Sequence, residues 1–185
     1  GTGVGSGIVI NGEVVYGHDG FAGELGHTAA VRNNGRLCNC GKTGCLETGA
    51  SGSALHRIFI EKLREGRASL LSDKFNKGEE ISLIDILNAV NEEDVLAIEV
   101  TEEVGTVLGR ALAGLINIFN PELVVIGGIV AKAQEYLLLP VKSAIQKHSL
   151  NMVNKDTKIK FSKLGEKAGP IGACMLSRSK LLGLI

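Results

Sequence analysis

Three of the chain's four cysteines, Cys38, Cys40 and Cys45, lie within eight positions of one another, and a carboxylate, Glu47, follows them. The nearest useful nitrogen ligand upstream is His27, which gives the pattern His-x10-Cys-x-Cys-x4-Cys. Three thiolates and one imidazole make a closed tetrahedral zinc site of the structural kind, with no position left for a reacting water. Such a ligand set suits zinc better than harder, oxygen-seeking ions. The spacing therefore predicts a structural zinc ion held by His27, Cys38, Cys40 and Cys45.

The alternative for this cluster is three reduced thiols buried as small hydrophobic groups. It fits poorly, because the neighbours Asn39, Gly41 and Lys42 do not belong to an apolar core. Cys174 differs, since it lies at helical spacing from Ile171, and we expect it to be a core thiol. The remaining histidines show no partner pattern and are expected at the surface or in satisfied pairs: His18, His56 and His148.

The composition is that of a globular protein without an electrostatic preference for nucleic acid. The 20 basic and 20 acidic residues of the 185-residue chain cancel, so no net field draws it to DNA or to an anionic membrane. No apolar run approaches the roughly twenty residues of a membrane span, and no leader peptide opens the chain. We therefore expect a cytoplasmic protein, in which clustered cysteines more often bind metal than form disulfides. The abrupt glycine-rich start indicates a piece of a longer protein.

The elements before the longest helix position the cysteine cluster. Asn11-Gly12 between two β-branched runs predicts a hairpin within residues 6–17. Residues 17–49 lack periodicity, so we expect a local cross-link such as a metal ion to hold them in place. A helix is expected after Ser51 or Ser53, with its end at Gly66, and a polar loop at residues 67–80. Its apolar face is formed by Leu55, Ile58, Phe59 and Leu63.

Two helices and a sheet are predicted after this loop. Ser82 can cap a short helix with Asp85 at the third position, and Asn91 can cap the longest helix, which Asn120-Pro121 ends. The apolar stripe of that helix comprises Val104, Val107, Leu108, Ala111, Leu112, Leu115, Ile116 and Phe119. The run "ELVVIGG" then predicts a parallel strand buried on both faces, and hence an α/β fold. Further expectations are a helix over 130–138, a helix starting at Pro140, a strand over 157–162 and a last helix opened by Pro170.

Several motifs occur together and in order: "GTGVGSG" at 1–7, "GELGH" at 23–27, "CNCGKTGCLE" at 38–47, "NPELVVIGG" at 120–128 and "GPIGA" at 169–173. Over nearly the whole chain they resemble the ROK family, which comprises repressors, open reading frames and kinases. The resemblance implies an actin-like ATPase fold (hexokinase-like, ribonuclease H-like), in which two α/β lobes close on a sugar. Residues 1–185 would form a single C-terminal domain, with the N-terminal lobe and any DNA-binding domain outside this chain.

The resemblance also assigns roles to residues. It implies that Glu24, His27 and Glu47 bind sugar hydroxyls, with one His27 nitrogen on zinc and the other facing the sugar. The alternative is that both glutamates are solvated loop charges. Phosphate or nucleotide would bind at Thr2 and Gly3, where a plain tight turn is the alternative, and at Gly127 and Gly128. No catalytic residue is assigned, because no residue here matches the family's catalytic aspartate.

Two functions follow from the resemblance. One is the sugar-sensing and oligomerising part of a transcriptional regulator, which would form a homodimer or tetramer and contact DNA only through an upstream helix-turn-helix. The other is a kinase that uses ATP and Mg²⁺ to phosphorylate a hexose or amino sugar. A kinase-derived scaffold that binds no ligand is a third alternative. Three features favour the regulator. Ile129 stands where family kinases usually have a third glycine, and the stretch 63–93 looks like the longer insertion of the regulators related to N-acetylglucosamine and xylose repressors. The run "GLINIFNPELVVIGG" also resembles those regulators more closely than the glucokinases. The long helix and the last helix are candidate dimer surfaces, although either could be core.

Overall fold

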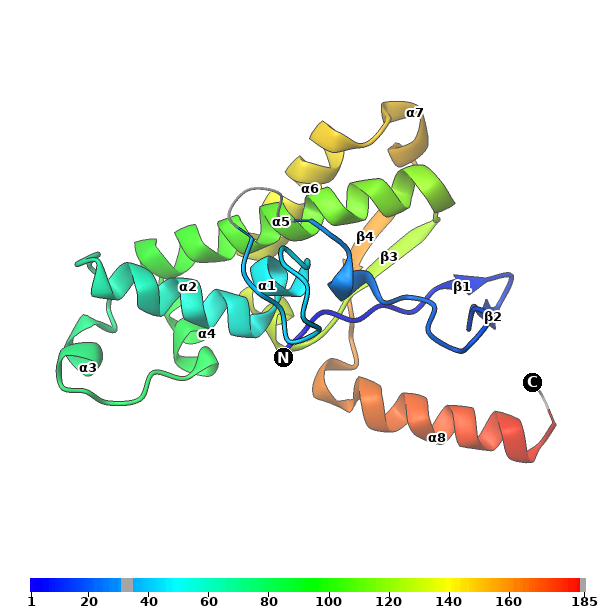
Figure 1. Cartoon of the computed structure of the whole chain (residues 1–185), viewed down its shortest axis with the longest axis horizontal. Coiled ribbons are helices and arrows are strands. Elements are labelled where there is room, and N and C mark those ends of the chain that lie inside the picture. The colour runs from blue at the N-terminus through cyan, green and yellow to red at the C-terminus, as the bar shows by residue number, and fades with distance from the viewer. Residues whose placement is uncertain (31–34, 184–185) are drawn as a thin grey trace.

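A computed structural model describes residues 1–30 and 35–183, except the side chain of Glu166 (Figure 1). Its strands are β1 (Val9–Ile10), β2 (Glu13–Val14), β3 (Leu123–Ile126) and β4 (Lys158–Phe161). Its α-helices are α1 (Glu47–Ala50), α2 (Gly52–Arg64), α3 (Ser72–Asn76), α4 (Leu83–Asn91), α5 (Val95–Phe119), α6 (Glu135–His148), α7 (Asn151–Asn154) and α8 (Ala168–Leu181). Short 3₁₀ helices are η1 (Leu25–His27), η2 (Ile129–Ala133) and η3 (Gly165–Lys167).

The predicted hairpin and parallel strand pair are both present. Strands β1 and β2 pair antiparallel across Asn11 and Gly12, whose φ angles of 53° and 84° suit the predicted turn. Strands β3 and β4 pair in parallel. The expectation that β3 is buried on both faces is wrong, because only Val124 and Ile126 turn toward the core. Leu123 and Val125 are 47% and 55% exposed, so the described helices cover one face of this strand pair.

The core lies mainly between α5 and the helices around it. The longest helix, α5, contacts α2, α4 and α6, and its residues Val104 and Ile116 are fully buried. At Gly109 a Cβ atom would lie 2.5 Å from the Val141 carbonyl oxygen of α6. Glycine at this position therefore lets the two helix backbones approach closely. The other large, fully buried side chains include Leu46, Leu55, Phe59, Ile86, Leu87, Leu96, Leu137 and Val141.

Two helices are capped by the residues predicted from the sequence, and one is capped by a different residue. The Ser51 side chain accepts a hydrogen bond from the Ala54 backbone and caps α2, and Ser82 forms the predicted capping box with Asp85 at the start of α4. The prediction that Asn91 caps the long helix is wrong. Helix α4 runs through Asn91, and Asp94 caps α5 by accepting a hydrogen bond from the Ala97 N–H at 2.7 Å.

Three other elements differ from expectation. The polar loop contains the short helix α3, which was not predicted. Pro140 lies inside α6 and does not start a helix, because the chain turns at Gln134, whose φ is 50°, and α6 begins directly after it. The expected helix over 130–138 is therefore η2 followed by the first turn of α6.

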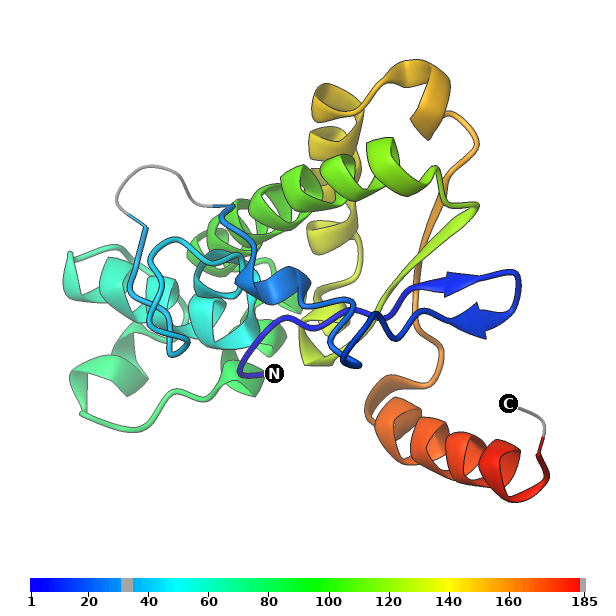
Figure 2. The same ribbon diagram turned by 45° about the vertical axis from the view of Figure 1, so that its right-hand side comes forward.

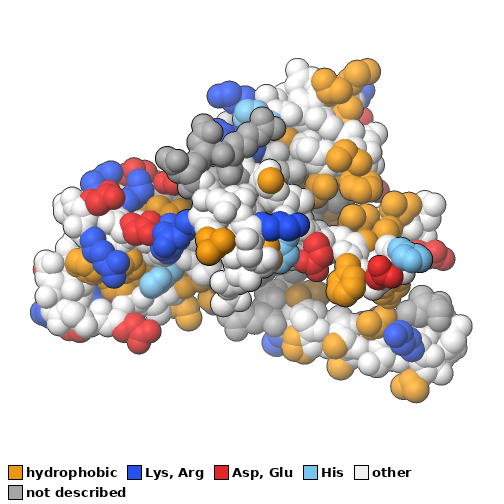
Figure 3. All heavy atoms as spheres, viewed as in Figure 1, with side chains coloured by type: hydrophobic (Ala, Val, Ile, Leu, Met, Phe, Trp, Pro, Cys, Tyr) orange, Lys and Arg blue, Asp and Glu red, His pale blue; other side chains and the backbone are white. Residues whose placement is uncertain are grey.

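Helix α8 is present, as predicted, but its position makes one expectation wrong. It begins at Ala168, two residues before Pro170, and stands apart from helices α1 to α7 in both ribbon views (Figures 1 and 2). Cys174 is therefore exposed instead of a core thiol. Hydrophobic side chains gather at the surface over the hairpin and along α8 (Figure 3). Among the described residues, no helix is both long and apolar enough to cross a lipid bilayer.

Candidate functional site

The predicted metal ligands come together. The ligand atoms of His27, Cys38, Cys40 and Cys45 all lie within 4.8 Å of one another. Cys38 Sγ is 3.7 Å from His27 Nδ1, and Cys40 Sγ is 3.5 Å from Cys45 Sγ. A tetrahedral ion with ordinary zinc–sulfur and zinc–nitrogen bonds separates its ligand atoms by about 3.6 to 3.8 Å. These two distances are close to that separation, and the four side chains could together hold a metal ion.

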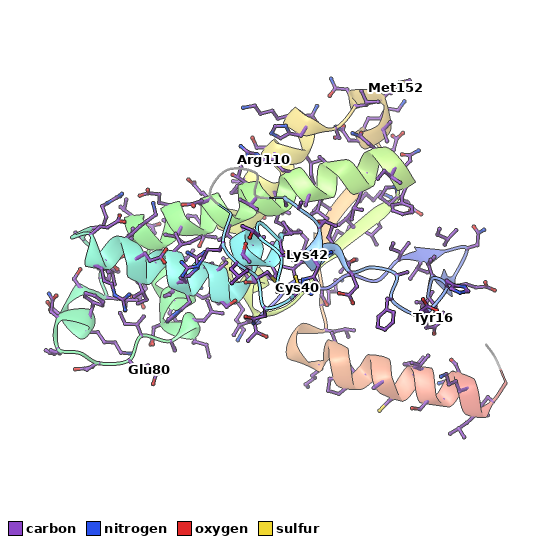
Figure 4. All side chains as sticks on the ribbon, in the orientation of Figure 1. Tyr16, Cys40, Lys42, Glu80, Arg110 and Met152 are labelled. Carbon is purple, nitrogen blue, oxygen red and sulfur yellow. The ribbon has the colours of Figure 1, made fainter. Side chains whose placement is uncertain are left out.

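Backbone hydrogen bonds shape the cysteine loop. The Cys38 N–H donates to the Lys42 carbonyl at 2.7 Å, and the Gly41 N–H donates to the Cys38 carbonyl at 2.9 Å. Gly41 takes a φ of 84°, in the left-handed region that glycine tolerates best. These contacts form a tight turn that buries Cys38 while Cys40 is exposed, and Figure 4 shows Cys40 beside Lys42. Backbone hydrogen bonds therefore hold the loop in a shape that places Cys38 next to His27.

The thiols differ in acidity. A hydrogen bond from the Lys42 backbone, with help from the Cys45 side chain, lowers the pKa of Cys40 to about 7. A hydrogen bond from the Cys40 backbone lowers the pKa of Cys38, but the Glu47 carboxylate and burial outweigh it and raise the pKa to about 12. Burial, and then the neighbouring Cys40, raises the pKa of Cys45. Because a metal binds thiolates, its binding to this cluster displaces protons.

Glu24 and Glu47 flank the imidazole of His27. The Nδ1 atom of His27 lies on the cysteine side, 3.9 Å from Glu47 Oε1, and its Nε2 atom lies 3.9 Å from Glu24 Oε2. Glu47 Oε1 also accepts a hydrogen bond from the Cys38 thiol at 3.0 Å. The Glu24 side chain is 62% exposed and that of Glu47 19% exposed. Two carboxylates and one imidazole nitrogen thus border the candidate metal-binding cluster of His27, Cys38, Cys40 and Cys45.

Gly3 lies against this group of residues. A Cβ atom on Gly3 would be 2.5 Å from Glu47 Oε2, and one on Gly26 would overlap the Val4 carbonyl oxygen. The glycine-rich start of the chain therefore passes directly beside Glu47. Sequence reasoning gave Gly3 only a phosphate or turn role, and no spacing in the sequence indicated its contact with Glu47.

Of the other residues predicted to bind phosphate, Thr2 contacts the start of α2, whereas Gly127 and Gly128 make no such contact themselves and are followed by Val130, which does. Thr2 accepts a hydrogen bond from Ser53 through its backbone carbonyl at 2.6 Å. A Cβ atom on Gly52 would lie 2.8 Å from the Gly1 carbonyl oxygen and 3.3 Å from a methyl group of Val130. The N-terminal turn and the segment after Gly127-Gly128 therefore meet at Gly52. Sequence reasoning missed this junction, which only the tertiary fold creates.

The remaining histidines behave as expected. His56 Nε2 is within hydrogen-bond distance of the Ile81 carbonyl oxygen, at 2.7 Å, and is thus a satisfied histidine. The His18 and His148 side chains are at the surface. These three residues lie outside the metal cluster.

Comparison with known proteins identifies a family match and relatives of two functional classes. The model of the ROK family matches residues 1–180. A glucokinase of Halalkalibacterium halodurans is 40% identical over 180 residues, which are 97% of this chain and 54% of the glucokinase. The chain therefore spans about half the length of this curated relative.

The similar solved structures also include both a regulator and a kinase. A ROK family transcriptional regulator, a homologue of the Escherichia coli MLC protein, is 38% identical with a TM-score of 0.79, over 86% of this chain and 39% of the regulator. A ROK family glucokinase from Streptomyces griseus, solved with glucose and AMPPNP, is 32% identical with a TM-score of 0.85, over 97% of this chain and 58% of the glucokinase. Similarity alone therefore does not separate regulator from kinase.

Proposed function

Because the chain belongs to the ROK family, with its actin-like, hexokinase-like α/β fold, we propose that it is the sugar-sensing part of a ROK transcriptional regulator. In this proposal a monosaccharide or amino sugar binds at Glu24, His27 and Glu47, beside a structural zinc ion. The observation that carries the sugar site is the position of His27, whose Nδ1 atom faces the cysteines and whose Nε2 atom faces Glu24.

Zinc is the ion that best suits this donor set. Three sulfurs and one imidazole nitrogen disfavour Mg²⁺ and Ca²⁺, which take oxygen ligands. With all four positions filled by protein, the ion holds the loop in shape and activates no water. When bound, it fixes the tautomer of His27 so that Nε2 is directed away from the metal.

The carboxylates supply the recognition of a sugar. Glu24 and Glu47 offer acceptor oxygens for vicinal hydroxyl groups, and the His27 ring adds a further polar atom. An epimer that leaves one of these acceptors without a partner loses affinity, so such a group discriminates between sugars. The glucose complex of the Streptomyces griseus relative supports a hexose as the first candidate.

Regulation is preferred to catalysis because of Ile129. This branched residue begins η2 directly after Gly127-Gly128 and packs against the core, at the turn where we expect a nucleotide to approach in a kinase. Sugar binding in a regulator would bias lobe closure and so reposition DNA-binding heads across a homodimer or tetramer.

A kinase is the second candidate, favoured by the 40% identical glucokinase and by the intact "GTGVGSG" turn next to Gly52. In that case Thr2, Gly3, Gly127 and Gly128 would contact ATP, with Mg²⁺ on its phosphates. The two candidates share the sugar site and differ in whether nucleotide binds.

Calorimetry of the zinc-loaded full-length protein with glucose, xylose and N-acetylglucosamine tests the sugar site. We expect Glu47→Gln to weaken the binding of the preferred sugar at least about tenfold, since a charged acceptor is lost. Glu65→Gln, at an exposed residue just after α2, is the matched control and should bind as the unaltered protein does. Equal sugar affinity in the two variants would contradict the assignment of Glu47.

Nucleotide binding separates the two candidates. The regulator predicts no heat of binding for ATP with Mg²⁺ and no sugar-dependent release of ADP in a coupled assay. ADP release that requires both the sugar and the full-length protein would overturn the regulator in favour of the kinase. Metal analysis of the purified protein is expected to find close to one zinc ion per chain.

A further inference from the structure

We infer that Arg57 is a positioning residue for the sugar site: it holds the start of α1, and with it Glu47, in place from the side of α2. This inference rests on the proposed function, because it assigns to Arg57 the orientation of a residue proposed to bind sugar. It concerns a face of the molecule that carries neither metal ligands nor the residues proposed to contact the sugar.

The key contact joins α2 to α1. The Nη2 atom of Arg57 donates a hydrogen bond to the carbonyl oxygen of Thr48 at 2.9 Å. Thr48 follows Glu47 directly, in a helix of four residues. So short a helix leaves its last carbonyl groups without partners of its own, and they need outside donors. A guanidinium is a suitable donor there, because it also complements the negative end of the helix dipole.

Thr48 connects the hydrogen bond from Arg57 to the cysteine loop. Its hydroxyl and its backbone N–H both donate to the carbonyl oxygen of Cys45, at 2.7 and 3.0 Å. Cys45 is one of the four residues proposed to bind the metal. A single residue therefore contacts a metal ligand on one side and Arg57 on the other, and Glu47 is covalently attached to it.

A second cation extends the contact to the other end of the loop. Glu61, one turn after Arg57 on α2, accepts hydrogen bonds from Arg57 Nη1 and from Arg36 Nη1, both at 2.7 Å. Arg36 lies two residues before Cys38, and its carbonyl oxygen accepts from the Gly44 N–H at 2.9 Å. Hydrogen bonds therefore run from Arg36 through Glu61 and Arg57 to Thr48, and they link both ends of the cysteine loop to helix α2.

The exposure of these three charged side chains indicates which of them contributes most to holding Glu47 in place. The Arg57 side chain is 29% exposed, that of Glu61 41% and that of Arg36 55%. All of them line a groove of about 400 Å³, where water competes for their charges. Exposed ion pairs contribute little, whereas the less exposed, charge-assisted hydrogen bond to the Thr48 carbonyl keeps more of its strength. We therefore assign the positioning role to Arg57 and a supporting role to the two outer charges.

The test compares Arg57→Met with Arg64→Met in the zinc-loaded full-length protein. Arg64 lies on the same helix but is exposed, so it is the matched control. Calorimetry with the sugar that the unaltered protein binds best is combined with metal analysis and a thermal melt. For Arg57→Met we expect about tenfold weaker sugar binding with the metal content unchanged, as for the loss of a hydrogen bond to a charged group. Arg64→Met should bind as the unaltered protein does.

Two more variants separate positioning from general stability. Arg57→Lys keeps a donor for the Thr48 carbonyl and should recover most of the lost affinity, although it cannot bridge to Glu61 in the same way. Glu61→Gln leaves the Arg57 donor in place and should weaken sugar binding only about twofold. Should Arg57→Met fold poorly, Arg57→Gln takes its place in the same measurements. Weaker sugar binding in Arg57→Gln with unchanged metal content, and recovery in Arg57→Lys, would support the inference, whereas sugar affinity in Arg57→Gln equal to that of the unaltered protein would overturn it.

The remaining outcomes are distinct. If the unaltered protein binds its sugar and folded Arg57→Met binds it equally well, the positioning role is overturned while the proposed function stands. If Arg57→Met loses metal together with sugar affinity, its role is to retain the metal, which also overturns the inference. If the unaltered protein binds none of the three sugars, the proposed function fails and the inference fails with it.

Discussion

Replacing Cys40 with alanine would separate the contribution of the proposed metal ion to stability from that of packing. Cys40 is exposed, whereas Cys38 and Cys45 are buried, so its truncation leaves no cavity in the core. A bound ion at a free concentration a thousand times its dissociation constant stabilises the folded state by about 4 kcal/mol. A variant that loses one of four ligands, and with it most of the affinity, forfeits nearly all of this amount. For a chain of this size the melting temperature should fall by roughly 8 to 16 °C.

The assay is a thermal melt of the zinc-loaded protein before and after treatment with a chelator, together with metal analysis. We expect chelation to lower the melting temperature of the unaltered protein and to have little effect on Cys40→Ala. Cys174→Ala is the matched control, because Cys174 is also exposed but lies on α8, outside the metal cluster. A Cys40→Ala variant with a full complement of zinc, or with an unchanged melting temperature in zinc, would refute the assignment of this ligand.

Two further predictions concern the scaffold. Gly109→Ala would place a Cβ atom 2.5 Å from the Val141 carbonyl oxygen and should destabilise the fold by about 1–2 kcal/mol in urea, whereas Gly114→Ala meets no atom within 4 Å and should stabilise it slightly. The hydroxyl of Ser82 and the ammonium of Lys74 lower the pKa of Asp85 to about 2, so its stabilisation is present above the ordinary value of 3.8 and is lost as the pH falls toward 2. Asp85→Asn should therefore cost about 1 kcal/mol at pH 7 and nearly nothing at pH 2; a cost that does not change with pH would contradict this.

The parts of the fold that the sequence predicted depend on local chemistry. Asn11-Gly12 predicts its turn because few other pairs accept two left-handed residues, and Ser82 with Asp85 predicts a capping box because both hydrogen bonds are made within four residues. The proximity of Cys38, Cys40 and Cys45 was predictable for the same reason, since these thiols lie in one short loop. The hairpin turn, the capping box and the three clustered thiols are each determined by residues that lie close together in the chain.

The expectations that were wrong depend on tertiary packing. Asn91 and Asp94 are both good capping residues, and the choice of Asp94 follows from where α4 ends. An apolar strand looks the same whether one or both of its faces are covered, so the exposure of Val125 could not be read from the sequence. The contact of Gly3 with Glu47 joins residues far apart in the chain. Long-range placement of this kind requires the folded structure.

The position of the metal cluster in the chain has a consequence for biosynthesis. His27 and Cys45, separated by 18 residues, bracket the whole ligand set, and all of it precedes the long helix α5. Closing a loop of this length is fast, whereas pairing β3 with β4 must wait until α6 has been made. Because domains emerge from the ribosome N-terminus first, the ligands are complete while most of the core is still unsynthesised. If the cluster binds a metal, as proposed, the ion would be bound before α5 and α6 pack on this part of the chain.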